Sequence, residues 1–570
     1  MTSRTTNWRR ALLNAGAAPL ALIALAACRD GDATTPFQPA GPAPTPGTTP
    51  TPTPPPATGT AVTIDGVVTF DLVPAATSPV SLNYDVIQRA PSRSVVVEAL
   101  DATGAVVASD ITDVNGFYAL TVTPNTDVQI RVRANMRSED GATESFAVSV
   151  RDNTSNNAEY ALIGALASSG ADNSTRDLTA LSGWDGTSYA GERAAGPFAV
   201  LDAIFETVAP IVAVDPDVDF PEMQVLWSPD NRPSDGDIAD GDVTTSFFTS
   251  NGFALPTIVL LGAENVDTDE YDRHIVVHEF GHYIEDQLSR SDSTGGPHTL
   301  DIRLDPRLAF SEGFANALSG LILNDPVYRD TSGPGQANGF SFSVEDNAIA
   351  PGNVGWFSEG STQSIVFDVG DAVDDGVDTL DGGIGLVYAA LTSPAYSQGD
   401  AFTTIYAFAD ALRVVGAPDA AVDALLGGQA ISGTGPFGEG ETNNGGVPVV
   451  LPVYRTPIVG GAPEEVCNVD DGRTGVPASF GDFASLGLNA FARFTTPAAG
   501  AFTITAQRTS GASPVDPDFI IFNDGDVAAF GFDPVANVEQ APAQLPAGDF
   551  AAEIRTFNFS EDVCYDFSVQ

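Results

Sequence analysis

The spacing of apolar residues changes twice along this chain of 570 residues, and the changes limit the folds that it can adopt. From about residue 61 to 166, apolar and polar residues alternate, which is typical of β-strands buried on one face. From about 167 to 457 the spacing becomes largely helical, and from 458 to 570 alternation returns. The sequence therefore predicts a multidomain protein with an α+β domain between two β-sandwiches. In the α+β domain we expect short buried strands at 223–227 and 256–261 and helices at 270–290, 308–323, 361–372, 383–392 and 399–414.

The first 60 residues predict export and a spacer. Residues 1–28 join early arginines to a short apolar run that ends in Leu25-Ala26-Ala27-Cys28, which resembles the lipobox of bacterial lipoprotein signal peptides. That resemblance implies lipidation of Cys28 and an exported protein held on a bacterial membrane, at the outer membrane or cell surface. Residues 29–60 are rich in Pro and Thr, so they predict an extended linker.

The charge of the chain excludes one class of partner. It has 75 acidic residues against 24 basic residues, all of them arginine, and a formal net charge of -51. Such a chain repels phosphates, so we expect no nucleic-acid partner and no membrane contact beyond the lipid anchor. Two acidic, glycine-containing loops at 235–242 and 374–381 either bind Ca²⁺ or are solvated loops of a very acidic protein.

Two cysteines remain once Cys28 is assigned to the lipid. Cys467 and Cys564 both lie in the C-terminal alternating region. In an oxidising compartment this pattern predicts a disulfide, and two unrelated buried thiols are the alternative.

The chemistry of the chain is concentrated in its histidines. The chain has four, and His274, His278 and His282 fall within nine residues. Residues four apart lie on one face of a helix, so His278 and His282 can bind one metal ion, with Glu279 placed to polarise a metal-bound water. Catalytic zinc takes three protein ligands and keeps one position open, so a third ligand must come from elsewhere.

Glu312 is the preferred third ligand. Phe310, Phe314 and Leu318 recur every four residues around it and predict a buried helix, on which a lone carboxylate is costly unless it is paired or binds metal. His298, in a glycine-rich loop, and Glu359, just before a predicted helix, are the alternatives.

The motif at 278–282, followed by Glu312 on a second helix, resembles the gluzincin metallopeptidases. The resemblance implies a Zn²⁺ cofactor, a peptide or protein substrate, and Glu279 as the catalytic base that activates a zinc-bound water. It is supported by likenesses of Asp113–Tyr118 to carboxypeptidase-regulatory-like domains and of 491–522 to pre-peptidase C-terminal domains.

Residues near the ligands are candidates for supporting roles. Many gluzincins have an aspartate four residues after the ligand glutamate that orients the first histidine, and this chain has Asn316 there. His298 is a candidate oxyanion donor, and His274 is expected to support the site from behind. Further candidate oxyanion donors are Tyr283, Tyr388 and Tyr396.

Two other functions are open at this stage. One is a non-catalytic surface adhesin or scaffold with a structural metal, and the other is a metal-dependent hydrolase of non-peptide substrates. The intact Glu279 favours an enzyme, because a structural metal gains nothing from an unligated carboxylate beside it.

Overall fold

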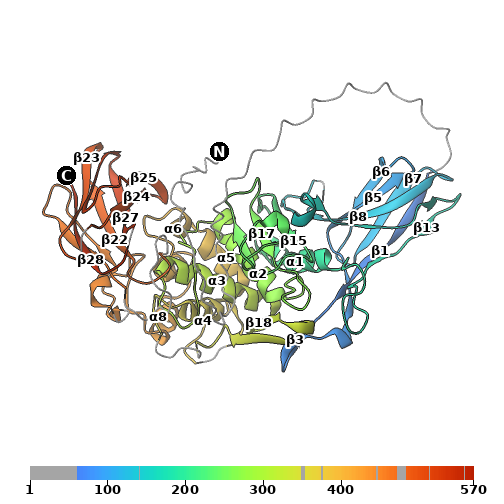
Figure 1. The fold of residues 1–570 in the computed structure, drawn as a ribbon, viewed down its shortest axis with the longest axis horizontal. Helices are drawn as coiled ribbons and strands as arrows, with labels where there is room; N and C mark the ends of the chain where they lie inside the picture. The colour runs from blue at the N-terminus through green and yellow to red at the C-terminus, as the bar shows by residue number, and fades with distance from the viewer. Residues whose placement is uncertain are drawn as a thin grey trace, which may run out of the picture.

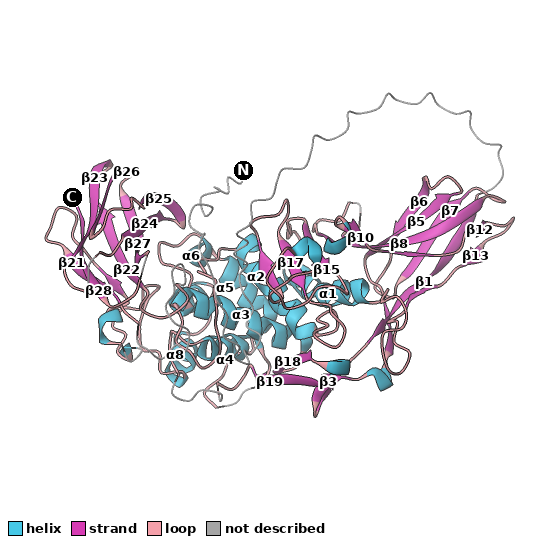
Figure 2. Ribbon diagram, in the orientation of Figure 1, coloured by secondary structure: helices cyan, strands magenta, loops and turns pink. Residues whose placement is uncertain are grey.

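The computed structural model describes residues 61–139, 141–347, 353–373, 376–444, 447–470, 483–511, 514–557 and 559–570. Within these ranges the chain forms a β-rich N-terminal part, a central group of helices and a C-terminal pair of sheets, which follow one another in a row (Figure 1). Figure 2 shows that the helices concentrate in the middle part. Cys28 and the linker at 29–60 lie outside the described residues.

Strand β1 (Val62–Leu72) organises the first sheet. Its residues alternate between buried and half-buried, as the sequence pattern predicts. It pairs with four strands, which are β4 (Gln88–Pro91), β7 (Phe117–Val122), β13 (Ser174–Thr175) and β14 (Leu178–Ala180). The last two lie beyond residue 166, where this part of the chain was expected to end. They run parallel to β1 and occupy an edge that would otherwise be open.

A second sheet of ten strands runs from the N-terminal part into the central part. At the junction, β15 (Met223–Trp227) pairs in parallel with β9 (Ala147–Asp152) on one side and β17 (Thr257–Leu260) on the other. Every residue of β15 and β17 is buried, which explains why these strands are mostly apolar and do not alternate. Their two polar side chains satisfy each other, since Nε2 of Gln224 donates to the Thr257 hydroxyl at 3.1 Å. The remaining strands are β5 (Val95–Asp101), β6 (Val106–Ile111), β8 (Asp127–Arg137), β10 (Ala158–Glu159), β11 (Ala161–Ile163), β12 (Ala167–Ser168) and β16 (Phe247–Thr249).

The helices pack beside this sheet. They are α1 (Gly196–Val214), α2 (Arg273–Leu288), α3 (Pro306–Leu323), α4 (Glu359–Gly370), α5 (Gly383–Thr392), α6 (Pro394–Ser397), α7 (Ile405–Val414) and α8 (Asp419–Gly428). Two short hairpins, β2 (Ala75–Thr77) with β3 (Val80–Leu82) and β18 (Val327–Ser332) with β19 (Asn338–Ser343), lie against each other at one side (Figure 1).

The helix expected at 399–414 begins later, at Ile405. The preceding backbone is engaged elsewhere, since the N–H of Phe402 donates to the Tyr454 hydroxyl at 3.0 Å and that of Thr403 donates to Asp292 at 2.9 Å. These tertiary hydrogen bonds replace a first helical turn.

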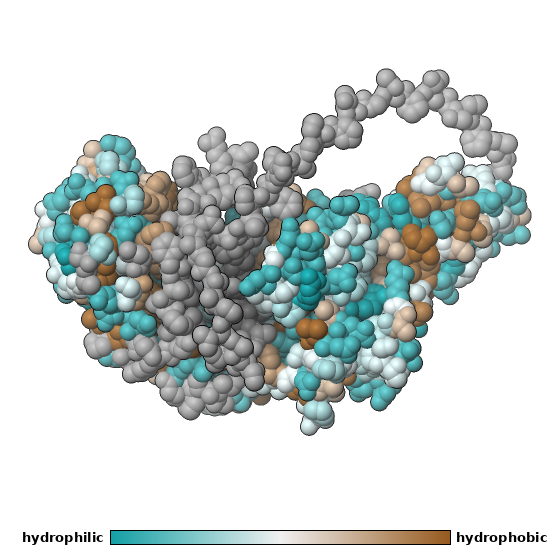
Figure 3. Space-filling model, viewed as in Figure 1, coloured by the Kyte–Doolittle hydropathy of each residue, from teal (hydrophilic) through white to brown (hydrophobic). Residues whose placement is uncertain are grey.

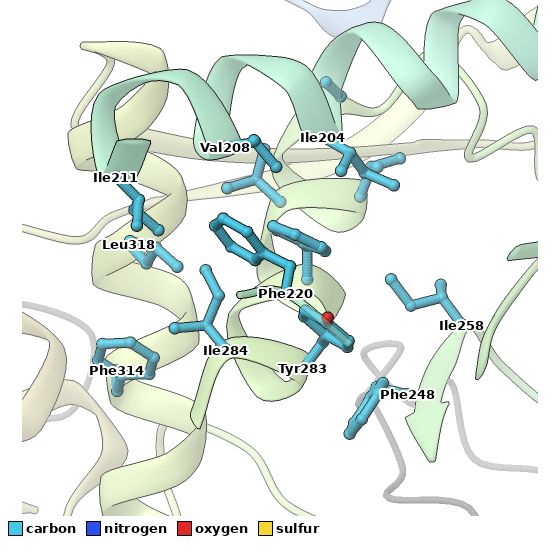
Figure 4. Packing of buried hydrophobic residues seen from close by; sticks show 14 of the residues in the cluster. Ile204, Val208, Ile211, Phe220, Phe248, Ile258, Tyr283, Ile284, Phe314 and Leu318 are labelled. Atoms are coloured by element: carbon cyan, nitrogen blue, oxygen red, sulfur yellow. The ribbon is translucent and has the colours of Figure 1, made fainter. Parts of the chain in front are cut away.

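Helix α1 contributes apolar side chains to the core that it shares with α2 and α3. Its Ile204, Val208 and Ile211 face Ile284 of α2 and Leu318 of α3 (Figure 4). By length and composition α1 could cross a membrane, but most of it is buried inside the protein. Its apolar composition is therefore accounted for by this core.

Glycines let the central helices approach closely. A Cβ on Gly281 of α2 would lie 3.1 Å from the Cα of Ala315 on α3. A Cβ on Gly313 would lie 2.6 Å from the Cβ of Thr362 and 2.7 Å from the backbone oxygen of Glu359, both on α4. The spacing of α3 and α4 therefore requires glycine at 313.

The C-terminal part consists of two sheets over one core. The first is ordered β20 (Tyr454–Arg455), β22 (Asn489–Thr496), β27 (Gly548–Thr556), β24 (Pro517–Asn523) and β25 (Asp526–Gly531). The second is ordered β21 (Glu464–Asn468), β28 (Val563–Val569), β23 (Gly500–Arg508) and β26 (Val538–Leu545). Cys467 and Cys564 form a disulfide between paired residues of β21 and β28, as predicted.

Arg307 joins this part to the central helices. It lies in the first turn of α3, is 2% exposed, and donates to Asp305 at 2.9 Å and to Glu553 of β27 at 2.6 Å. Its guanidinium also lies over the ring of Phe491, 4.9 Å from the centroid. The start of α3 is therefore fixed by a buried ion pair to the C-terminal sheet.

On the face shown in Figure 3 the described residues are mostly hydrophilic, and apolar side chains gather over the N-terminal strands and over part of the C-terminal sheets. The exposed apolar side chains of the N-terminal strands include Val106 and Val107 on β6 and Phe117 on β7.

Replacing Gly313 with alanine should destabilise the protein by about 1–3 kcal/mol, because the methyl group has rigid backbone as a neighbour on α4. The matched control is Gly427→Ala in α8, where no atom of the described residues lies within 4 Å of the added Cβ. That change should be neutral or stabilise by up to about 1 kcal/mol. Thermal unfolding of both variants measures the difference, and equal melting temperatures would contradict the packing argument.

Candidate metal centre

Three side chains from two adjacent helices converge on one point. The Nε2 atoms of His278 and His282 on α2 lie 3.1 Å apart. They are 3.3 Å and 3.4 Å from Oε2 of Glu312 on α3. All three side chains are buried, and together they form a group with metal-binding potential.

The separations match what one small metal ion requires. Ligands about 2.0–2.2 Å from a tetrahedral zinc lie roughly 3.3–3.5 Å from one another. The three measured separations, 3.1, 3.3 and 3.4 Å, fall at or just below this range. The three atoms can therefore occupy three corners of such a site without rearrangement.

A relay of amides sets the tautomer of His278. The backbone oxygen of Ser343 can only accept, so the hydrogen bond of 3.0 Å from Gln363 uses the Nε2 of that side chain. Oε1 of Gln363 then accepts from Nδ2 of Asn316 at 3.2 Å. Oδ1 of Asn316 is left to accept from Nδ1 of His278 at 2.9 Å. The Nε2 of His278 consequently presents a lone pair.

A second relay does the same for His282. Ser311 donates its only proton to Oε2 of Glu285 at 2.6 Å. The Ser311 oxygen therefore accepts from Nδ1 of His282, which lies 3.2 Å away. Two imidazole lone pairs and a carboxylate then face one another, an arrangement that repels itself until a cation lies between them. The donor set fits Zn²⁺, which prefers imidazole and carboxylate ligands in this geometry.

His298 reaches the same carboxylate from the loop between α2 and α3. Its Nε2 lies 3.2 Å from Oε2 of Glu312, and its Nδ1 lies 3.2 Å from the backbone oxygen of Gly296. Burial alone would lower the pKa of His298, but the charges of Glu312 and Glu359 raise it above its usual value. Burial would raise the pKa of Glu312, yet the neighbouring imidazoles, His298 first among them, hold it well below its usual range.

Glu279 is fully buried next to the ligand pair, on the same helix. His274 lies one turn earlier and takes no part in the convergence. Its Nδ1 pairs with the Ser319 hydroxyl at 3.1 Å, and its ring lies 5.3 Å from that of Tyr328. Burial lowers the pKa of His274 to about 3, so it is neutral.

The other candidate residues lie behind the ligands or elsewhere. Oε1 of Glu359 accepts from Asn316 at 2.8 Å, so Glu359 supports the amide that holds His278. The Tyr283 hydroxyl donates to the backbone oxygen of Pro221 and that of Tyr388 to Asp215, which directs both away from the ligands. The Tyr396 hydroxyl lies 3.4 Å from Glu285, behind His282.

The loop at 235–242 uses several carboxylates internally. Asp242 accepts from Arg232 at 2.5 Å, and Asp237 caps a 3-10 helix through the N–H of Ala239. The second acidic loop, 374–381, lies partly outside the described residues.

Three supporting residues were not predicted. Ser311, Glu285 and Gln363 complete the relays to the two histidines. Ser311 and Glu285 are polar residues within the buried parts of α3 and α2. A polar residue among apolar neighbours on a predicted buried helix is the sequence pattern that could have revealed them. Gln363 carries no such signal, because only the packing of α4 on α3 places it beside Asn316.

Comparison with known proteins finds a family match in this central part. Residues 222–390 match the family model for the Mycolysin C-terminal domain, a stretch that contains α2, α3 and α4. The match supports a metallopeptidase-associated architecture and points to a protease family. No curated protein matches the chain.

Two solved structures resemble part of the chain weakly. The pre-peptidase C-terminal domain of collagenase from Bacillus anthracis is 13% identical over 20% of this chain and 96% of that chain, with a TM-score of 0.15. PliG from Aeromonas hydrophila, a periplasmic inhibitor of g-type lysozyme, is 15% identical over 20% of this chain and 99% of that chain, with a TM-score of 0.12. Scores this low define no fold for the chain.

Replacing Asn316 with alanine should weaken zinc binding by about 10–100-fold, because His278 loses the acceptor that fixes its tautomer. Ser319→Ala is the control, since Ser319 binds His274 instead of a converging residue. Competition with a chromogenic chelator measures both affinities. Equal affinity in Asn316→Ala and the unmodified protein would refute the orienting role.

Proposed function

We propose that this protein is a zinc metallopeptidase in which His278, His282 and Glu312 hold the metal and Glu279 is the catalytic base. The observation that carries the proposal is the convergence of two imidazole lone pairs and one carboxylate at 3.1–3.4 Å. The match of 222–390 to the Mycolysin C-terminal domain supports a peptide or protein as the substrate.

Each residue has a defined task in this proposal. A bound Zn²⁺ acidifies water and polarises a carbonyl. Glu279 takes a proton from the attacking water and passes it to the leaving amine. His298, held 3.2 Å from Glu312 by its loop, is placed to donate to the developing oxyanion. Burial of these groups lowers the local dielectric and strengthens each of these interactions.

We also propose that the protein is exported and lipidated on Cys28, with the segment 29–60 as a spacer. The disulfide between Cys467 and Cys564 supports an oxidising compartment. A mass shift on the N-terminal peptide of protein purified from membranes, absent in Cys28→Ser, is the expected result. An unmodified Cys28 in that fraction would refute it.

Glu279→Gln should retain zinc but lose about 10²–10⁴-fold in peptide hydrolysis, because the amide cannot accept the proton. The measurement is mass spectrometry of a diverse peptide mixture incubated with the zinc-loaded full chain. Asp286→Asn, which changes the same charge on the same helix, is the control and should keep its activity.

Turnover by Glu279→Gln at the unmodified rate would refute the mechanism. A protein that binds one zinc and cleaves nothing would instead favour a non-catalytic surface protein with a structural metal.

A further inference from the structure

Four aspartates form a second buried cluster at the start of α2. Asp267 and Asp269 lie in the loop after β17, Asp272 is the residue before the first turn of α2, and Asp330 lies on β18. One carboxylate oxygen from each lies within 4.8 Å of the others. The four residues are between 2% and 9% exposed.

Little in the surrounding protein compensates this charge. Among the described residues, no arginine forms an ion pair with any of the four. The nearest partners are neutral, namely the N–H and hydroxyl of Thr331 on Asp272 and the hydroxyl of Ser246 on Asp269. In addition, Oδ1 of Asp267 and Oδ1 of Asp269 are buried and have no hydrogen-bond partner in the described structure. Buried oxygens of this kind cost free energy unless a cation or proton satisfies them.

The backbone holds the four residues together independently of their side chains. Asp267 forms a β-bridge with Ser332, and the N–H of Gly333 donates to the backbone oxygen of Val266 at 2.8 Å. The loop after β17 is thereby joined to the β18–β19 hairpin. The carboxylates therefore face one another because the fold places them there.

We propose that Asp267, Asp269, Asp272 and Asp330 form a Ca²⁺ site that joins the N-terminal end of α2 to β18. Ligands on opposite sides of Ca²⁺ are about 4.6–5.2 Å apart, so oxygens within 4.8 Å of one another can all contact one ion. A set of ligands made only of oxygen atoms suits calcium better than zinc, because zinc sites in proteins usually include histidine nitrogen or cysteine sulfur. Mg²⁺ keeps several waters, for which so buried a cluster has little room.

The alternative occupant is the proton. Burial, and then the charge of Asp269, raise the pKa of Asp267 to about 12, and burial raises the pKa of Asp269 to about 6. Both pKa values are shifted in the direction that favours protonation, so a shared proton is the occupant that competes with a cation. Calcium and protons compete for the same oxygens, so only a binding measurement separates them.

The site would act on α2, the helix that carries His278 and His282, from its N-terminal end. Asp272 precedes α2, and His278 follows six residues later on that helix. Fixing Asp272 to Asp330 of the hairpin fixes the position of this helix. The inference does not depend on peptidase activity, because calcium binding and stability are its readouts.

The test uses the full chain, freed of metal on a chelating resin and reloaded with one equivalent of zinc. The buffer contains about 0.15 M NaCl, an ionic strength at which interactions between distant surface charges are largely screened. CaCl₂ at a large excess should raise Tm by several degrees, and MgCl₂ should raise it much less. Calorimetric titration should show that the unmodified protein binds one more tight Ca²⁺ than the double variant Asp269→Asn/Asp330→Asn. That variant should lose the calcium-dependent rise in Tm.

The matched control is Asp235→Asn/Asp240→Asn, which removes the same charge from the exposed acidic loop. It should keep both the tight Ca²⁺ and the rise in Tm. If Asp269→Asn/Asp330→Asn does not fold, Asp330→Asn alone provides the comparison. A calcium response that is absent from the unmodified protein, or that survives in the cluster variant, would overturn the proposal.

Discussion

The close approach of α2 and α3 is the contact on which the candidate metal centre depends. Only across this contact can Glu312 come within 3.4 Å of two histidines that lie one turn apart on the other helix. Gly281 makes room for Ala315 at that contact, and Gly313 makes room for α4 on the opposite side of α3. The apolar side chains of α1 then press on α2 and α3 from behind (Figure 4). The two glycines therefore allow the helix spacing at which His278, His282 and Glu312 converge.

Buried charge is organised in two different ways around α2. At the metal centre, Asn316 and Ser311 accept hydrogen bonds from the Nδ1–H groups of the two imidazoles, so the Nε2 lone pairs are oriented before any ion arrives. At the aspartate cluster, by contrast, the backbone fixes the position of the carboxylates and leaves their oxygens with few donors. The first arrangement selects a ligand by directed lone pairs, and the second selects it by charge and size.

Much of this could be predicted from the sequence because local patterns encode it. Alternation located β5, β8, β22 and β23, and four-residue spacing located α2 and α3 with His278, His282 and Glu312 on them. Long-range contacts were not encoded in this way. The pairing of β1 with β13 and β14, about 110 residues away, depends on topology that no local pattern reveals. The aspartates at 267–272 and Asp330 are likewise separated in sequence and meet only through the β18 hairpin. The relay through Gln363 depends on the packing of α4.

The continuous ten-stranded sheet has a consequence for how the molecule comes apart. Strands β9 and β15 pair in parallel, so the N-terminal strands and the strands beside α2 belong to one hydrogen-bonded sheet. Separating these two parts would break main-chain hydrogen bonds in the middle of a buried sheet and expose both new edges to water. The N-terminal strands and the central helices therefore form a single cooperative folding unit. A protease that cut the connection between β14 and α1 would yield a nicked protein whose two fragments stay associated.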